Sequence, residues 1–222
     1  KIMGRPVKFV ADRLESFTSD IHARDHEIEA KIAVDAEGKI LALEVDDWTG
    51  IGPYSVYPRT SAIEGNQVVN LCGGPYDFAN YRAQTTVVFQ NKTPTCQYRA
   101  VGHPIAVAIT EGLVDMAAAE LGLDPVEIRR RNMYADDAYP VTSPANMRFE
   151  GLSHHASMDK LIGLMDYDAL RADLAEARKQ GRHRGIGIAS FIELTNPSPF
   201  MYGIGGARIS AQDGCTVRMD PD

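Results

Sequence analysis

Residues 94–106, PTCQYRAVGHPIA, place a fixed cation beside small residues and the start of a helix. The guanidinium of Arg99 is always charged and offers a planar fork of hydrogen-bond donors. Ala100 and Gly102 are small enough for backbone N–H groups to approach a ligand, and a helix starting near Pro104 directs its positive end to the same place. The segment is therefore a candidate anion-binding or active-site loop for a phosphate, a carboxylate or a metal-oxo group. The alternative is a solvated arginine in a strand-to-helix turn.

Four other side chains could do chemistry, each with an ordinary alternative. Cys96 could act as a thiolate nucleophile or a soft metal ligand, but no base is near it in the sequence, and a buried inert thiol is the alternative. His103 could donate a hydrogen bond to a bound anion or could simply fill space before the helix. His154 and His155 could ligate a metal, but adjacent loop residues rarely point the same way, so solvent exposure is the alternative.

Glu193 ends an apolar run and precedes a loop rich in proline and glycine that contains Asn196, Phe200 and Met201. A carboxylate beside apolar loop residues can line a small-molecule pocket in which a few polar groups fix orientation. A capped surface loop is the alternative interpretation.

The composition is typical of a folded globular protein. The 222 residues are 44% hydrophobic and 24% charged, which allows one large domain or two small ones. The net charge of −7 argues against a general nucleic-acid-binding protein. The three cysteines form no CxxC pair, so no zinc knuckle or disulfide framework is indicated, and a reducing cytoplasm is the expected compartment. Glu111, Asp115 and Glu120 interrupt the apolar run at 104–123, so we expect no membrane span there.

Hydrophobic periodicity predicts an α+β fold with mixed β-sheets and helices packed on them. Alternating apolar residues on both sides of a turn at 35–38 predict a β-hairpin over about 26–45. A 3.6-residue period after Pro104 and the capping pattern at Asp124 predict two consecutive helices, 104–121 and 125–133. The other predicted elements are a β-like run at 6–12, a loop with about one helical turn at 49–65, strands at 81–90 and 183–194, a loop with a possible domain sub-boundary at 134–158, a helix at 166–180 and a strand pair at 207–220.

Five segments together resemble the molybdenum-binding large subunit of the xanthine dehydrogenase, aldehyde oxidase and carbon monoxide dehydrogenase family. They are GRPVKFVADRLESF at 4–17, GKILALEVDDWTGIGPYS at 38–55, the stretch from TPTCQYRAVGHP to DPVEIRRRNMY at 93–134, RGIGIASFIE at 184–193 and DGCTVRMD at 213–220. The YRAVGHP loop followed by the double helix is the most specific part. The resemblance implies an internal fragment, residues 1–222, of the first molybdopterin-binding domain of a molybdenum hydroxylase, truncated at both ends.

Members of this family hydroxylate an aldehyde or a heteroaromatic substrate at a molybdenum atom held by molybdopterin, with water as the oxygen source. Their electrons leave through iron–sulfur clusters and usually FAD on partner domains or subunits. The resemblance implies no direct metal ligand in this chain. It assigns cofactor binding to Tyr98, Arg99, Ala100 and Gly102, with Arg99 beside the metal-oxo group, and the substrate pocket to Val101, Glu193, Phe200 and Met201.

Departures from the family pattern reduce the range of substrates that we expect. Ala100 stands where the carbon monoxide enzymes carry a cysteine, and residues 60–68 lack the arginine with which purine-oxidising members orient substrate, so neither carbon monoxide nor xanthine is expected. Val101 stands where relatives place a substrate-stacking aromatic ring. The general-base glutamate is expected downstream, so the chain alone is expected to be inactive. The alternative is a non-catalytic protein-binding or assembly module of the same fold.

Overall fold

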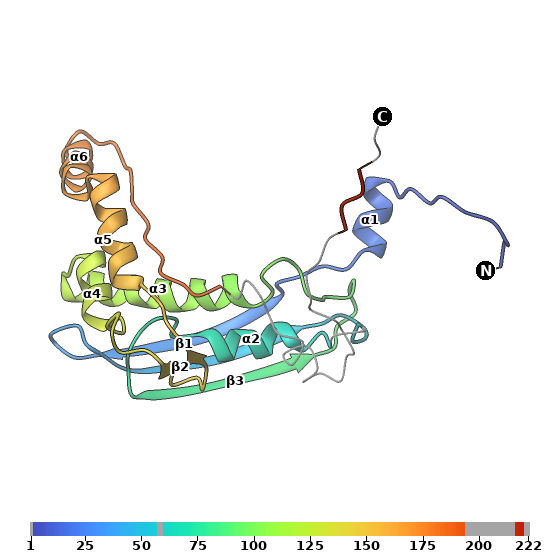
Figure 1. Ribbon diagram of the computed structural model, residues 1–222, viewed down its shortest axis with the longest axis horizontal. Helices are drawn as coiled ribbons and strands as arrows, with labels where there is room; N and C mark the ends of the chain where they lie inside the picture. The colour runs from blue at the N-terminus through green and yellow to red at the C-terminus, as the bar shows by residue number, and fades with distance from the viewer. Residues whose placement is uncertain (1, 57–59, 194–215, 220–222) are drawn as a thin grey trace.

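A three-stranded mixed sheet forms the centre of the molecule in the computed structural model, which describes residues 2–56, 60–193 and 216–219. β1 (His26–Val34) pairs antiparallel with β2 (Ile40–Gly50), with Ala30 opposite Val45. β3 (Asn80–Val88) pairs parallel with the other edge of β2, with Ala83 opposite Val45. The predicted hairpin, the predicted strand near 81–90 and the α+β class are confirmed (Figure 1).

The turn between β1 and β2 follows from two residue types. The Asp35 carboxylate accepts hydrogen bonds from the backbone N–H groups of Glu37 at 3.1 Å and Lys39 at 2.8 Å, as turn-forming aspartates commonly do. Gly38 has a φ of 83°, which glycine adopts without steric strain. The buried side chain of Asn132 donates to the Gly38 carbonyl at 2.7 Å. This bond ties the hairpin turn to the helix that contains Asn132.

Two helices pack on the sheet and cover its core side (Figure 1). α2 (Ile63–Leu71) connects β2 to β3, and α3 (His103–Leu121) contacts both α2 and β1. Leu43 and Val45 point from β2 into the core, where they join Val68 of α2 and Ala106 and Val114 of α3. Burial of these apolar side chains is the main source of stability for the layer.

The helices that follow agree with the sequence prediction as far as Asn132. α3 ends at Gly122, whose φ is 66°, and α4 (Pro125–Asn132) begins after it. Asp124 caps α4, because its carboxylate accepts from the backbone N–H of Val126 at 2.8 Å. Both helices and both caps are confirmed. Among the described helices, none combines the length and apolar character needed to cross a bilayer.

Two predicted loops each end in a longer helix than the sequence predicts. The stretch at 49–65 leads into the full helix α2, in which Gly65 allows close contact with the sheet: a Cβ there would lie 2.4 Å from Thr49 Oγ1. The predicted loop at 134–158 ends in α5 (His154–Met165), which left-handed Asp166 separates from α6 (Tyr167–Lys179). Only α6 is confirmed, as the helix predicted at 166–180. The remaining loop contains a short strand pair, β4 (Val141–Thr142) and β5 (Arg148–Phe149).

Two predicted strands are contradicted by the described residues, and a predicted strand pair lies largely outside them. Residues 6–12 form no strand and lead into α1 (Arg13–Ser19). Residues 184–193 are also not a strand; they are anchored by the Arg129 guanidinium, which donates to the Ile188 carbonyl at 2.8 Å. Both segments alternate like strands but lack a neighbouring strand to bond to, and a ladder needs one. The pair at 207–220 lies outside the described residues except for 216–219, which form no strand.

Candidate functional site

The loop between β3 and α3 turns sharply at Ala100 and Val101. Both residues have left-handed backbone, with φ of 69° and 50°, which is unfavourable for a β-branched residue such as valine. The backbone N–H of Val101 donates to the Tyr98 carbonyl at 2.7 Å, and that of His103 donates to the Ala100 carbonyl at 3.0 Å. These bonds close two successive turns, and the side chains of Tyr98 and Arg99 before them are exposed.

Gly102 brings this loop into contact with α2. A Cβ at this position would lie 2.6 Å from the Glu64 carbonyl oxygen and 2.8 Å from the Val68 nitrogen, so only glycine fits without displacement. The backbone N–H of Gly102 also donates to Gln67 Oε1 at 3.0 Å. The loop is therefore fastened to α2 just before α3 begins.

Positive charge gathers at the exposed side of the loop. Within the part of the chain that the structure describes, no group accepts a hydrogen bond from the Arg99 guanidinium. The Arg24 guanidinium lies 5.1 Å from the ring centroid of Tyr98, which is 65% exposed, and donates to the Arg99 carbonyl. Two arginines beside one tight turn, in a protein of net charge −7, suit an anionic ligand.

His103 links the loop to the segment that carries Glu193. The Nδ1–H group of buried His103 donates to the Ala100 carbonyl at 2.8 Å, which places the proton on Nδ1 because a carbonyl can only accept. The Glu193 carboxylate comes within 4.0 Å of the same nitrogen. The structure therefore brings Glu193 close to the loop, although the two are far apart in the sequence.

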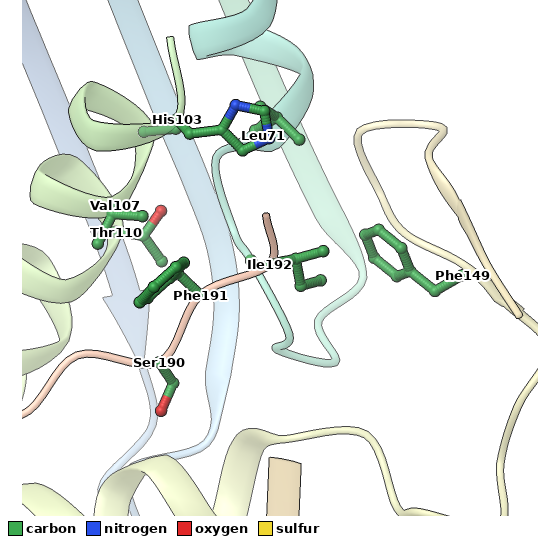
Figure 2. A pocket seen from close by; sticks show the side chains of 10 residues that line it. Leu71, His103, Val107, Thr110, Phe149, Ser190, Phe191 and Ile192 are labelled. Atoms are coloured by element: carbon green, nitrogen blue, oxygen red, sulfur yellow. The ribbon is translucent and has the colours of Figure 1, made fainter. Parts of the chain in front are cut away.

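The segment before Glu193 closes a small cavity against α3 (Figure 2). Phe191 and Ile192 lie between α3, which contributes His103 and Thr110, and Phe149 of β5. The cavity measures about 10 Å³, room for about one water molecule. It is too small for an aldehyde or a heteroaromatic ring. Phe200 and Met201, the other residues assigned to the substrate pocket, lie outside the described residues.

Of the remaining candidates, Cys96 has the burial that its ordinary alternative predicts, whereas His154 and His155 are half-buried and not solvent-exposed as theirs predicts. Cys96 is buried and its thiol faces Gln97 Oε1. His154 Nε2 faces the Phe191 carbonyl at 3.2 Å, whereas His155 Nε2 faces the Met133 carbonyl at 3.4 Å. The two imidazoles thus have separate backbone partners. The described residues contain no group of three or more His, Cys, Asp or Glu side chains that could hold a metal ion.

A buried polar cluster beneath the loop is absent from the sequence predictions. His26 Nδ1 lies 2.7 Å from Asp47 Oδ1, and His26 Nε2 lies 3.1 Å from Glu64 Oε1. The hydroxyls of Thr49 and Thr85 donate to Asp47 Oδ2 at 2.8 and 2.9 Å. Burial disfavours the imidazolium, but hydrogen bonds to the two carboxylates outweigh it and raise the pKa of His26 to about 9. His26 is therefore charged at neutral pH.

A signal for this cluster is present in β2. Asp47 and Thr49 continue the core-facing alternation of Val45, and both are fully buried. Polar residues at core-facing positions predict a buried hydrogen-bond network, since such groups rarely stay unpaired. The partners on β1 and α2 cannot be identified by this pattern, because they come together only in the folded sheet.

Comparisons with known proteins agree with the motifs. Residues 1–133 match the family model described as "Molybdopterin cofactor-binding domain". The large subunit of nicotine 6-hydroxylase from Paenarthrobacter nicotinovorans is 33% identical over 223 residues, covering 99% of this chain and 27% of that protein. The large chain of carbon monoxide dehydrogenase from Hydrogenophaga pseudoflava is 29% identical over 229 residues, covering 99% of this chain and 28% of that protein.

A solved structure shows the same fold. Quinoline 2-oxidoreductase from Pseudomonas putida 86 superimposes with a TM-score of 0.84 at 32% identity, covering 94% of this chain and 27% of that one. The chain thus spans little more than a quarter of the length of these relatives. Because the family match takes in more than half of the 222 residues, the chain belongs to the molybdopterin cofactor-binding domain family.

Proposed function

We propose that this chain is part of the large subunit of a molybdenum hydroxylase, an oxidoreductase that hydroxylates an aldehyde or an aromatic N-heterocycle with oxygen from water. The observation that carries the proposal is the exposed Arg99, presented by a tight loop that Gly102 fastens to α2. This loop lies within residues 1–133, which match the cofactor-binding family. The chain alone is proposed to be inactive, because the general base of the reaction is assigned to a part of the protein beyond it.

The residues present fit an anionic cofactor. Arg99 offers charge-assisted donors, Gly102 fastens the loop that carries it to α2, and the positive end of α3 lies directly behind the loop. On this proposal Tyr98, Arg99, Ala100 and Gly102 hold molybdopterin. When bound, the molybdenum cofactor supplies the electron-accepting and oxygen-transferring chemistry. Iron–sulfur and FAD domains or subunits are the proposed partners that remove the electrons.

In this scheme the residues of this chain bind and orient the cofactor and the substrate. The Arg99 guanidinium neutralises and orients the anionic cofactor at a fixed position, and such preorganised charge is a major source of catalytic power. His103 keeps the loop closed through its bond to the Ala100 carbonyl. Val101 and Glu193, together with Phe200 and Met201, are proposed to line the substrate side. Because Val101 is aliphatic, it offers a substrate ring no aromatic face to stack on.

Aromatic N-heterocycles are the first substrates to test. Two relatives more than 30% identical to this chain are named for nicotine and quinoline, which both contain an aromatic nitrogen ring. Ala100 in place of the cysteine of carbon monoxide enzymes makes carbon monoxide an unsuitable substrate on this proposal. Xanthine is likewise not proposed, because residues 60–68 contain no arginine to orient it.

The proposed cofactor role is tested with Arg99→Ala in the complete gene product, expressed together with its neighbouring redox subunits. We expect the variant to contain much less molybdenum per polypeptide than the wild type. We also expect it to lose the activity that the wild type has toward N-heterocycles. The matched control is Arg178→Ala, which removes an exposed arginine from α6, beyond the far end of α3 in Figure 1.

Two results would contradict the proposal. An Arg99→Ala protein with unchanged molybdenum content and activity would remove the assigned role of Arg99. A wild-type complete product that carries no molybdenum with any partner would instead favour the non-catalytic assembly module.

A further inference from the structure

Arg24 lies on a short segment that pairs with the chain entering the loop. The backbone N–H of His22 donates to the Pro94 carbonyl at 2.9 Å, and the His22 carbonyl accepts from the Cys96 N–H at 2.8 Å. His22 and Thr95 thereby form an isolated parallel bridge. The pairing places Arg24 beside the residues that follow Cys96.

The Arg24 side chain contacts the loop at two places. Its guanidinium donates to the backbone carbonyl of Arg99, the residue directly before the left-handed pair Ala100 and Val101. The same guanidinium lies 5.1 Å from the ring centroid of Tyr98, within the range of a cation–π contact. Arg24 therefore restrains the backbone of Arg99 and the ring of Tyr98.

Arg24 is itself held by the buried cluster. Its backbone is left-handed, with a φ of 63°, and its N–H donates to Glu64 Oε1 at 2.7 Å. The side chain of Glu64 is 1% exposed and lies 3.1 Å from His26 Nε2. Since Glu64 and Gln67 both lie on α2, that helix holds the loop from two sides, through Gln67 to Gly102 and through Glu64 and Arg24 to Arg99.

We propose that Arg24 is a positioning residue of the cofactor site, holding the Arg99 backbone so that the Arg99 guanidinium is presented to the anionic ligand. The buried Glu64 transmits the rigidity of α2 to Arg24. The inference rests on the proposed function only for the identity of the ligand. The restraint on the loop is a property of the protein without cofactor.

The restraint is measured by amide hydrogen exchange on the complete gene product purified without cofactor. Three variants are compared with the wild type: Arg24→Gln, Arg24→Lys and, as control, Arg13→Gln. Arg13 lies over the Phe17 ring at the same 5.1 Å and is outside the loop. In Arg24→Gln we expect exchange in a peptide covering residues 97–103 to rise about tenfold, since one charge-assisted bond closing a local opening is lost.

The controls separate local positioning from general destabilisation. Arg24→Lys keeps the charge and a donor, and we expect it to restore exchange to within about threefold of the wild type. Exchange in β2 is expected to stay unchanged in all variants, and Arg13→Gln is expected to match the wild type in the loop. Unchanged loop exchange in Arg24→Gln would overturn the inference, as would an equal rise throughout β2.

Molybdenum retention gives the second measurement. After dialysis of the loaded enzyme, we expect Arg24→Gln to keep several-fold less molybdenum than Arg13→Gln, and Arg24→Lys to lie between the two. Equal retention in the two glutamine variants would overturn the role of Arg24 at the site. If the wild type itself binds no molybdenum, the proposed function fails, and the exchange comparison still decides whether Arg24 positions the loop.

Discussion

Ala100 and Val101 hold the loop in a conformation that their side chains disfavour. Left-handed backbone at residues other than glycine costs about 1–3 kcal/mol each and persists only where surrounding contacts over-determine it. Here those contacts are the bond from Gly102 to Gln67 and the bond from Arg24 to the Arg99 carbonyl. The presentation of Arg99 thus depends on neighbours that need not touch a ligand themselves.

Substitutions at two glycines test whether the loop needs its contact with α2. Gly102→Ala places a Cβ 2.6 Å from the Glu64 carbonyl, so we expect the loop to move off α2, with a loss of about 1–3 kcal/mol in unfolding free energy and a loss of bound molybdenum. Gly112→Ala, in the middle of α3 with no atom outside the neighbouring helix backbone within 4 Å of the new Cβ, should stabilise by about 0.5–1 kcal/mol. Urea denaturation measures both. A Gly102→Ala protein as stable as Gly112→Ala would show that the contact with α2 is not needed.

The charge on His26 predicts a pH dependence of stability. The two carboxylates raise the pKa of His26 from 6.5 to about 9, so its stabilisation is full below pH 6.5 and is lost as the pH rises through about 9. We expect the stability advantage of the wild type over His26→Gln to shrink by at most about 3 kcal/mol across that window. Denaturation curves of the wild type and His26→Gln are measured at the same pH values, so that the contributions of the other titrating groups cancel in the difference. An advantage that stays constant with pH would mean that His26 is neutral in the folded protein.

The elements differ in how far their own sequence determines them. α3 and α4 are predictable because caps and hydrophobic period agree, with Gly122 and Asp124 marking their boundaries. α2 is not, because Gly65 and two adjacent valines disfavour a helix that only packing on the sheet explains. Residues 184–193 alternate like a strand, yet their position depends on Arg129, which reaches them across the fold. Long-range contacts of this kind leave no local pattern.

Arg129 joins α3, α4 and this segment into one unit. Its guanidinium is fully buried, bonds Glu111 and Asp115 of α3 at 2.8 Å each and donates to the Ile188 carbonyl at the same distance. Arg129→Met leaves the Glu111 carboxylate buried without its cation, so we expect a loss of about 3–5 kcal/mol. Arg130→Met, on the same helix and 38% exposed, should change stability by less than about 1 kcal/mol. Denaturant midpoints compare the two, and equal losses would contradict a structural role for the buried network.

At the scale of the whole molecule, the site combines local and distant contributions. The Arg99 loop could be predicted from its sequence because cation, small residues and helix start are contiguous, and Glu193 was assigned to it only through the family resemblance. Arg24 and His26 could not be predicted, because their partners lie on α2 and in the loop. The sheet therefore supplies the frame in which these segments meet.

Apolar side chains on the N-terminal segment and α1 predict the behaviour of the isolated 222-residue chain. Exposed apolar residues there include Val7, Phe9, Val10 and Phe17, between 53% and 79% exposed. Exposed apolar side chains favour association, so we expect the average mass in light scattering to rise with concentration. The double change Phe9→Ser and Val10→Ser should reduce that rise, whereas Leu164→Ser, which removes a 77% exposed leucine from α5, should not. Equal association of all three proteins would show that the N-terminal segment is not the contact surface.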